Sequence, residues 1–316
     1  MSMLLEARNL SKHYPSRDGK GVVKAVRNVS LAVREGETLG IVGESGCGKS
    51  TLARMLLRLI EPTSGEIVFE GENLLALGRA AMRKRRREIQ IVFQDPYASL
   101  DPRMTIAAII AEPLDIHGVG SRMERQTKVN QLLDLVGLDP ASAGRYPHEF
   151  SGGQRQRIGI ARAIALEPKL LVLDEPVSAL DVSIQSQILN LLDDLKTRLK
   201  LSYLFISHDL SVVQHVSDRV CVMYLGRIVE EGATAAVLGS PLHPYTQALI
   251  SAVPEIDPSR RRQRIILAGD PPNPEHIPPG CSFHPRCVHA FAPCPIQLPE
   301  SHDVSGRKVA CHLYAE

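Results

Sequence analysis

The sequence predicts an α/β protein built around a parallel β-sheet, and three observations lead to this prediction. A glycine-rich loop at 43–51 lies between an apolar strand at 38–42 and a helical segment. Apolar strands then alternate with helical segments from residue 170 to residue 231, as in sheets whose strands are joined by crossover helices. Helical periodicity at 105–165 interrupts this alternation, so we expect an inserted helical subdomain at about 95–165.

The first part of the chain carries short apolar segments that alternate with polar residues. Two of them lie at 22–26 and 29–33, and a third lies at 65–71. Alternation with a period of two is typical of strands with one buried face. We therefore expect an N-terminal antiparallel β subdomain.

Three segments of the insert have apolar residues at helical spacing, namely 105–114, 123–136 and 154–166. Before them, the segment 79–87 holds six basic residues and precedes an apolar strand at 89–93. A basic run of this kind can bind nucleic acid or form the solvated face of a helix. Balanced charge elsewhere favours the solvated face, and we expect no nucleic-acid partner.

The core continues with strands and helices in alternation. We expect strands at 170–174, 202–207, 219–224 and 227–231, and helices at 184–200 and 210–217. Beyond about residue 234 prolines become frequent, at 241, 244, 254, 258, 271, 272, 274, 278 and 279. Proline excludes long helices and central strands after about residue 253. The predicted domains are therefore 1–234 and an appended C-terminal region, 235–316.

Composition narrows the class of protein. The 316 residues include 37 Lys and Arg and 35 Asp and Glu, for a net charge of +2, which argues against a polyanion-binding chain. No apolar stretch reaches the ~18 residues that a membrane-spanning helix needs. The N-terminal residues lack the charged and apolar regions of a secretory signal. We expect a cytosolic location, with any membrane role supplied by a partner.

The glycine-rich loop fits the nucleotide-binding P-loop pattern G-x-x-x-x-G-K-[ST] at every fixed position. Successive backbone N–H groups and the start of the following helix would form an anion cradle for phosphates. Lys49 would reach the β- and γ-phosphates, and the Ser50 hydroxyl would bind Mg²⁺. The residues expected to bind nucleotide here are Gly43, Ser45, Gly46, Cys47, Gly48, Lys49, Ser50 and Thr51.

A second chemical element ends the buried strand at 170–174. Asp174 stands where a carboxylate can hold Mg²⁺ near the P-loop, usually through water. Glu175 follows directly, and a carboxylate there can orient or deprotonate the water that attacks the γ-phosphate. The pair predicts ATP hydrolysis rather than nucleotide binding alone.

A third element is the run Ser151-Gly152-Gly153-Gln154, which opens a predicted amphipathic helix after Phe150. Two glycines at a helix N-terminus form another anion site. One nucleotide does not need two phosphate cradles, so we expect this run to contact the γ-phosphate of ATP held by another subunit.

With these three elements in order, residues 4–234 resemble the ATP-binding cassette subunits of ABC transporters. The resemblance implies an ATPase that binds ATP and Mg²⁺. It further implies that Tyr14 stacks on adenine and that Gln94 contacts Mg²⁺ and the attacking water. Asp181 would belong to the D-loop, and His208 would contact the γ-phosphate. Phe150 departs from the leucine usual at its position.

The C-terminal region indicates which group of ABC transporter subunits the chain resembles. The segments 243–249 and 278–281 look like those of dipeptide and oligopeptide importer ATPases, and the whole chain is most similar to the second ATPase of dipeptide permeases. Nickel and glutathione importers share much of this pattern. The resemblance implies two transmembrane permease subunits, a sister ATPase (or a second copy of this chain) and an external or periplasmic peptide-binding protein. It places the chain peripherally on the cytoplasmic face of the inner membrane.

Four of the six cysteines gather in the C-terminal region, at Cys281, Cys287, Cys294 and Cys311. Disulfides are disfavoured in a cytosolic protein, and structural zinc more often uses C-x₂₋₄-C pairs. The wider spacing suits a cluster held by four thiolates, and similar peptide-importer ATPases carry a [4Fe–4S] centre. Zinc, or free or paired thiols, remain alternatives. Cys47 and Cys221 are expected to be small core residues.

Functions of other classes fit the sequence less well. A DNA-repair ABC ATPase would carry a long coiled coil between the P-loop and Ser151, and residues 51–150 show no sustained heptads. A ribosome-associated factor would hold two cassettes in one chain. An iron–sulfur redox sensor would not need the full set of hydrolytic residues.

Overall fold

The computed structural model describes residues 2–16, 21–95, 97–253, 265–267, 269–270 and 272–315. The chain forms two compact units. Unit 1 consists mainly of Ala76–Ile206 together with Arg34–Glu37. Unit 2 consists of Met3–Val33, Thr38–Leu75 and Ser207–Glu316. Pro96, Pro254, Pro258 and Pro271 lie outside the described residues.

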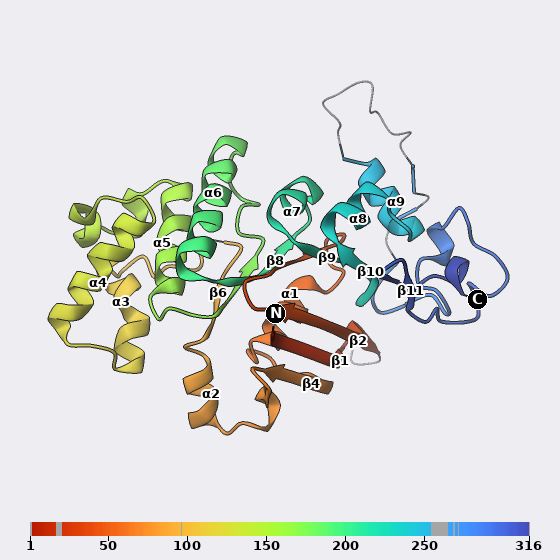
Figure 1. The fold of residues 1–316 in the computed structure, drawn as a ribbon, viewed down its shortest axis with the longest axis horizontal. Helices are drawn as coiled ribbons and strands as arrows, with labels where there is room; N and C mark the ends of the chain where they lie inside the picture. The colour runs from red at the N-terminus through yellow and green to blue at the C-terminus, as the bar shows by residue number, and fades with distance from the viewer. Residues whose placement is uncertain are drawn as a thin grey trace. The chain divides into compact units, whose positions relative to one another are not determined.

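Unit 2 contains the predicted antiparallel sheet, in the order β2-β1-β4-β5 (Figure 1). Its strands are β1 (Met3–Pro15), β2 (Val22–Arg34), β4 (Ser64–Phe69) and β5 (Glu72–Asn73). The prediction of two separate strands at 22–26 and 29–33 was wrong, since β2 runs through both. Asn28, between them, has a positive φ of 50°. This left-handed residue breaks the alternation locally without ending the strand.

A second sheet of unit 2 follows the order β11-β12-β10-β9-β3. Its strands are β3 (Thr38–Val42), β9 (Arg219–Tyr224), β10 (Arg227–Ala233), β11 (His302–Val304) and β12 (Arg307–Val309). β3 and β9 are parallel, whereas β12 pairs antiparallel with β10 through Glu230 and Val309. The C-terminal region therefore adds a hairpin to the edge of the sheet that carries the P-loop.

The helices of unit 2 are α1 (Lys49–Leu56), α7 (Leu210–Val216), α8 (Thr234–Gly239) and α9 (Pro244–Ser251). Gly40 of β3 allows α7 to approach closely, because a Cβ there would lie 2.7 Å from the Val213 side chain. Among the described residues after 253, the helices are single turns of 3₁₀ helix, at His284–Arg286 and His312–Tyr314. The prediction that proline excludes an inner strand there missed β12, which lies between β11 and β10 in the sheet and contains no proline.

Unit 1 has a parallel sheet in the order β8-β7-β6, formed by β6 (Ile89–Val92), β7 (Leu170–Asp174) and β8 (Ser202–Ser207). Its helices are α2 (Arg79–Arg85), α3 (Ile106–His117), α4 (Arg122–Leu135), α5 (Gly152–Ile164) and α6 (Val182–Leu199). Short 3₁₀ turns lie at Pro140–Gly144 and Pro147–Glu149. In α2 only Met82 is buried, so the basic run forms a solvated face.

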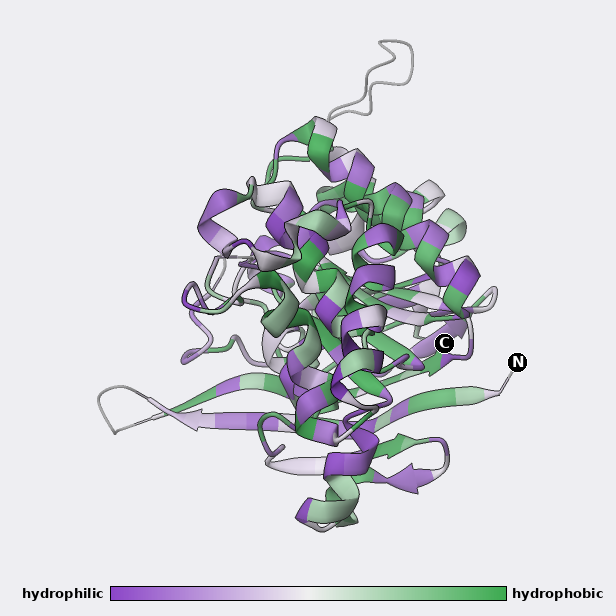
Figure 2. Ribbon diagram, turned by 90° about the vertical axis from the view of Figure 1, so that its left-hand side faces the viewer, coloured by the Kyte–Doolittle hydropathy of each residue, from purple (hydrophilic) through white to green (hydrophobic). Residues whose placement is uncertain are grey.

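Side-chain caps mark where the predicted insert helices begin. Thr105 accepts a hydrogen bond from Ala108 N–H at the start of α3, and Ser121 forms a capping box with Glu124 at the start of α4. α3 packs against α4 and α5 (Figure 1). In Figure 2 the helices alternate between hydrophobic and hydrophilic colours along their length, as expected for helices with one buried face. Among the described residues, no helix combines the length and apolarity that crossing a bilayer requires.

Candidate functional site

The P-loop of unit 2 connects buried β3 to α1. Gly48 precedes the helix with a φ of +106°, and a Cβ there would lie 2.2 Å from the Ala25 carbonyl oxygen. A Cβ on Gly43 would lie equally close to the Met223 carbonyl oxygen. Both positions therefore require glycine, because neighbouring backbone comes too near for any side chain.

Lys49 is buried, and its Nζ donates hydrogen bonds to the carbonyl oxygens of Gly43 (2.7 Å) and Glu44 (3.0 Å). The charged amino group thus lies over the loop that is expected to hold phosphates. Ser50 and Thr51 form the first turn of α1, while Ser45 and Gly46 are exposed at the loop tip. Burial raises the pKa of the Cys47 thiol, which fits its predicted role as a small core residue.

Two further predicted contacts of the nucleotide belong to unit 2. Tyr14 lies near the end of β1, half-buried, with the Lys12 Nζ 5.1 Å from the centre of its ring. His208 is exposed directly after β8. Asp209 follows it and caps α7 by accepting hydrogen bonds from Ser211 and Val212.

In unit 1, the structure brings Gln94 and Glu175 together. Asp174 ends β7 and is 3% exposed, whereas Glu175 is half-buried with a φ of 49°. The Glu175 N–H donates to the Ile206 carbonyl, 3.0 Å away, and the Gln94 Nε2 donates to the Glu175 Oε2, 2.9 Å away. Two of the three predicted catalytic residues are therefore in direct contact.

Helix α5 holds the loop that follows Gln94. The Arg155 guanidinium lies 3.9 Å from the centre of the Tyr97 ring, in cation–π geometry. Further along α5, the Arg162 Nη1 donates to the Ser99 carbonyl oxygen at 2.7 Å. Neither arginine could be identified from the sequence, since helical periodicity shows which face is buried but not which distant loop it meets. Tyr97 and Ser99 are thereby held against the helix that Ser151 caps.

Ser151 and Gln154 form a capping box at the start of α5. The Ser151 Oγ accepts from the Gln154 N–H, and the Gln154 Oε1 accepts from the Ser151 N–H. Gly153 is required by packing, because a Cβ there would lie 2.5 Å from the Ile184 side chain. Gly152 is half-buried, and exposed Asp181 precedes α6 without making a capping hydrogen bond. The run thus begins a capped helix whose N-cap Ser151 and third residue Gln154 are exposed.

The four C-terminal cysteines line one cavity in unit 2. Cys294 and Cys311 are buried and the other two are half-buried. Burial raises the pKa of the Cys311 thiol to about 11, and the neighbouring thiols of the cavity add to the rise. Glycine at position 280 allows the backbone there to lie close to the backbone at Cys294, because a Cβ would lie 2.4 Å from the Cys294 carbonyl oxygen. The predicted gathering of these cysteines is therefore present.

The cavity does not resemble a finished site for a single ion. In the part of the chain that the structure describes, no three His, Cys, Asp or Glu side chains are arranged to hold a metal ion. Four cysteine sulfurs around a tetrahedral zinc ion would have to lie about 3.8 Å from one another, because each Zn–S bond is about 2.3 Å long. Neither the zinc nor the iron–sulfur interpretation is confirmed by this arrangement.

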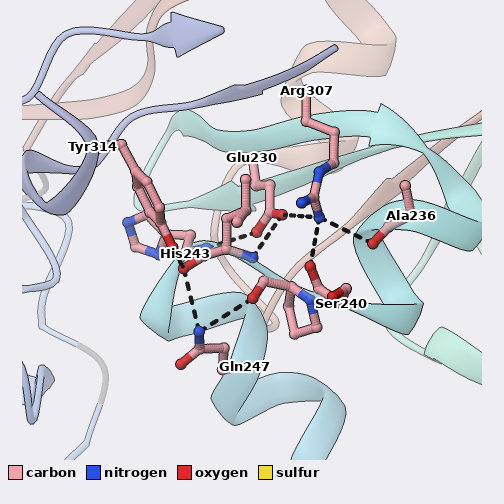
Figure 3. A network of polar contacts seen from close by, with 9 residues as sticks. Glu230, Ala236, Ser240, His243, Gln247, Arg307 and Tyr314 are labelled. Carbon is pink, nitrogen blue, oxygen red and sulfur yellow. Dashed lines mark hydrogen bonds and ion pairs between the residues drawn. The ribbon is translucent and has the colours of Figure 1, made fainter. Parts of the chain in front are cut away.

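A buried polar network fixes the start of the C-terminal region to β10 (Figure 3). Glu230 is fully buried and accepts from the N–H groups of Leu242 (3.0 Å) and His243 (2.9 Å). Arg307 lies 3.9 Å from the Glu230 carboxylate, and the Tyr314 hydroxyl donates to the Leu242 carbonyl. Burial lowers the pKa of His243 to about 3, so this ring is neutral and its Nδ1 accepts from the Tyr245 N–H.

Comparisons with known proteins agree with these features. The profile of the family described as ABC transporter matches residues 26–178, and that of the oligopeptide/dipeptide transporter C-terminal region matches residues 229–294. The oligopeptide transport ATP-binding protein AppF of Bacillus subtilis (strain 168) is 54% identical over 321 residues, covering 99% of this chain and 98% of that protein. The probable peptide ABC transporter ATP-binding protein y4tS of Sinorhizobium fredii is 52% identical, with 99% and 90% covered.

Solved structures show the same fold. The ATP-binding cassette MJ0796, in a dimeric post-hydrolysis state bound to ADP and phosphate, aligns with a TM-score of 0.67 and 31% identity. The alignment covers 73% of this chain and 99% of that one. A second dimeric structure of MJ0796, described as a bacterial ABC transporter cassette, aligns with the same TM-score and 30% identity.

Proposed function

Because this chain belongs to the ABC transporter family of ATP-binding proteins, we propose that it is the ATPase subunit that energises an importer of dipeptides or oligopeptides. One observation indicates that the solute is a peptide. The residues for ATP hydrolysis and a C-terminal region of the oligopeptide/dipeptide transporter type occur in the same chain. The relatives named for peptide transport span its whole length. Nickel or glutathione is the alternative solute, and a soluble role on DNA or ribosomes is less favoured.

The site residues take the following roles in this proposal. The P-loop amides and Lys49 bind the β- and γ-phosphates, and Ser50 and Asp174 hold Mg²⁺. Glu175 activates the attacking water, and Gln94, already bonded to it, orients that water and contacts the Mg²⁺. His208 contacts the γ-phosphate, Tyr14 stacks on adenine, and Asp181 belongs to the D-loop.

The Ser151–Gln154 run completes the site of a second ATP-binding subunit. Its capped, exposed helix N-terminus offers backbone N–H groups and a positive dipole end to a phosphate. ATP then lies between the P-loop of one subunit and this run of the other, so that ATP binding closes the pair and hydrolysis opens it. The same proposal assigns residues 1–234 to the ATP-binding domain and 235–316 to the C-terminal region.

Membership of the family implies membrane permease partners and pairing of ATP-binding subunits. We propose two permease subunits, a sister ATPase rather than a second copy of this chain, and an external peptide-binding protein, with the pair on the cytoplasmic face of the membrane. No nucleic-acid partner is proposed.

Isolated, this chain is expected to be mostly monomeric with slow ATP hydrolysis, because each site lacks the opposing Ser151–Gln154 run. Addition of the sister ATPase and the permease pair should raise the rate. Mass measurement by light scattering and a phosphate-release assay check both expectations. Full peptide-stimulated turnover by this chain with the permease pair alone would show that the two ATPase subunits are identical copies of this chain.

For the cysteine cavity we propose a [4Fe–4S] cluster held by Cys281, Cys287, Cys294 and Cys311. Four thiols line one cavity, and the other three add to the burial that raises the pKa of the Cys311 thiol, so a cationic group that binds thiolates would relieve their mutual repulsion. Zinc is the alternative cofactor, and the bound group would staple a proline-rich segment.

Protein purified without oxygen is accordingly expected to be brown and to contain about four iron atoms per chain. Iron and zinc analysis on the same sample distinguishes the two cofactors. Cys47→Ser and Cys221→Ser are matched controls, since both residues are buried away from the cavity lining and should leave the metal content unchanged. Stoichiometric zinc without iron would reject the cluster.

A further inference from the structure

The C-terminal region contacts the P-loop directly, at Glu44. Both terminal nitrogens of Arg286 donate to the Glu44 carboxylate, Nη1 to Oε2 at 3.0 Å and Nη2 to Oε1 at 3.1 Å. The Glu44 N–H donates to the Tyr245 hydroxyl, also at 3.0 Å. A residue of the phosphate-binding loop is therefore held through its side chain and its backbone by two C-terminal residues.

This ion pair is fixed by its surroundings. The Arg286 side chain is 7% exposed and that of Glu44 is 25% exposed. Tyr245 packs against Tyr224 with ring centres 4.5 Å apart, and Phe283 packs against both rings. A two-point arginine–carboxylate contact fixes the relative orientation of its two groups, which a single exposed ion pair does not. The contact is part of the packed interior around the loop.

Because Glu44 lies in the P-loop, its ion pair with Arg286 affects how the loop binds phosphates. A carboxylate in a loop that receives a polyphosphate repels it, and the repulsion grows as water is excluded. Arg286 cancels that charge and holds the carboxylate in one orientation. Lys49 binds the Glu44 carbonyl, so the same residue also helps to place the phosphate-binding lysine.

Arg286 itself is placed by the cysteine segment. It ends the short turn His284–Arg286 and directly precedes Cys287, while the turn follows Cys281. Within this turn the His284 N–H donates to the Cys281 carbonyl and the Arg286 N–H donates to the Phe283 carbonyl. The conformation that presents Arg286 to the P-loop is therefore set between two cysteines of the cavity.

We propose that Arg286 is a positioning residue of the nucleotide site, which keeps the Glu44 carboxylate neutralised and oriented, so that nucleotide affinity depends on an intact cysteine segment. The proposal rests on the proposed function, because it requires the P-loop to bind ATP. It extends that function by giving the C-terminal region a part in nucleotide binding. A purely structural role for Arg286, as a tie between two parts of unit 2, is the competing explanation.

Titration of the full-length chain with Mg²⁺ and a fluorescent ATP analogue separates the two explanations. Arg286→Gln should weaken binding about tenfold, because it leaves the Glu44 charge uncompensated beside the phosphates. Glu44→Gln alone should bind at least as well as the wild type. The double variant should regain affinity to within about threefold of the wild type, since no charge then remains to repel the ligand. A double variant as weak as Arg286→Gln would overturn the proposal.

Arg27→Gln is the matched control. The Arg27 Nη1 donates to the Ser282 Oγ at 2.9 Å and so ties β2 to the same segment without a contact to Glu44. It should leave nucleotide affinity unchanged, and an equal loss in this variant would contradict a specific role for Arg286.

Cys287→Ser tests the dependence on the cysteine segment. It should weaken the same titration by a similar factor and add little in an Arg286→Gln background. Unchanged affinity in Cys287→Ser would refute this dependence. Failure of the wild-type chain to bind nucleotide would instead refute the proposed function, whereas a wild type that binds and an Arg286→Gln variant that binds equally would refute only this inference.

Discussion

Replacement of Glu175 by glutamine is expected to lower ATP hydrolysis by a factor on the order of 10² to 10⁴ while ATP still binds. Glutamine keeps the shape of the side chain and can still accept the hydrogen bond from the Gln94 Nε2. It has neither the charge nor the basicity to activate water. A phosphate-release assay and a nucleotide titration on the assembled transporter measure the two quantities separately.

Glu167→Gln is a matched control for this substitution. Glu167 also lies in unit 1 and has a φ of 54°, close to the 49° of Glu175, but it pairs with Lys128 at an exposed site. Its replacement removes the same charge from a similar backbone conformation and should leave turnover unchanged. Normal turnover by Glu175→Gln in the assembled transporter would show that another group activates the water.

Replacement of Lys49 by alanine is expected to weaken ATP binding by one to two orders of magnitude. A hydrogen bond from a charged donor contributes about 1.5–3 kcal/mol, which corresponds to roughly 10- to 150-fold in affinity. The lysine amino group is buried over the loop carbonyls, where a phosphate oxygen can take the place of those acceptors. Titration with a fluorescent ATP analogue measures the loss.

Lys84→Ala is the corresponding control, because Lys84 is exposed on α2 and its loss removes the same charge far from the loop in sequence. It should bind ATP as the wild type does. In kinetic terms Lys49→Ala should mainly raise KM, whereas Glu175→Gln should mainly lower kcat. Wild-type affinity in Lys49→Ala would mean that the loop amides alone bind the phosphates.

Local signals in the sequence predicted the elements that carry the site. β7 and β8 occur at the predicted bounds, because fully buried apolar runs are distinctive and end at polar residues. The P-loop could be predicted from its glycines, and the close backbone approaches at Gly43 and Gly48 explain why they are needed. The start of α5 could be predicted because Ser151 and Gln154 form the cap expected from their spacing.

The sequence could not predict the long-range contacts that shape the site. Arg286 pairs with Glu44 across 242 positions, and no periodic pattern links residues so distant. The cation–π contact between Arg155 and Tyr97 could not be predicted for the same reason. The β11–β12 hairpin was also missed, because each strand is three residues long and too short to show alternation.

If ATP hydrolysis by this chain drives peptide import, the two processes must be coupled in the assembled transporter. The coupling is measured as the rate of ATP hydrolysis by the transporter in lipid vesicles, with and without the peptide-loaded binding protein. We predict a low rate that rises when the loaded binding protein is added, and that stays low when this chain carries Glu175→Gln. A rate that nickel or glutathione raises and peptides leave unchanged, or one that is insensitive to every solute, would show that this chain does not energise peptide import.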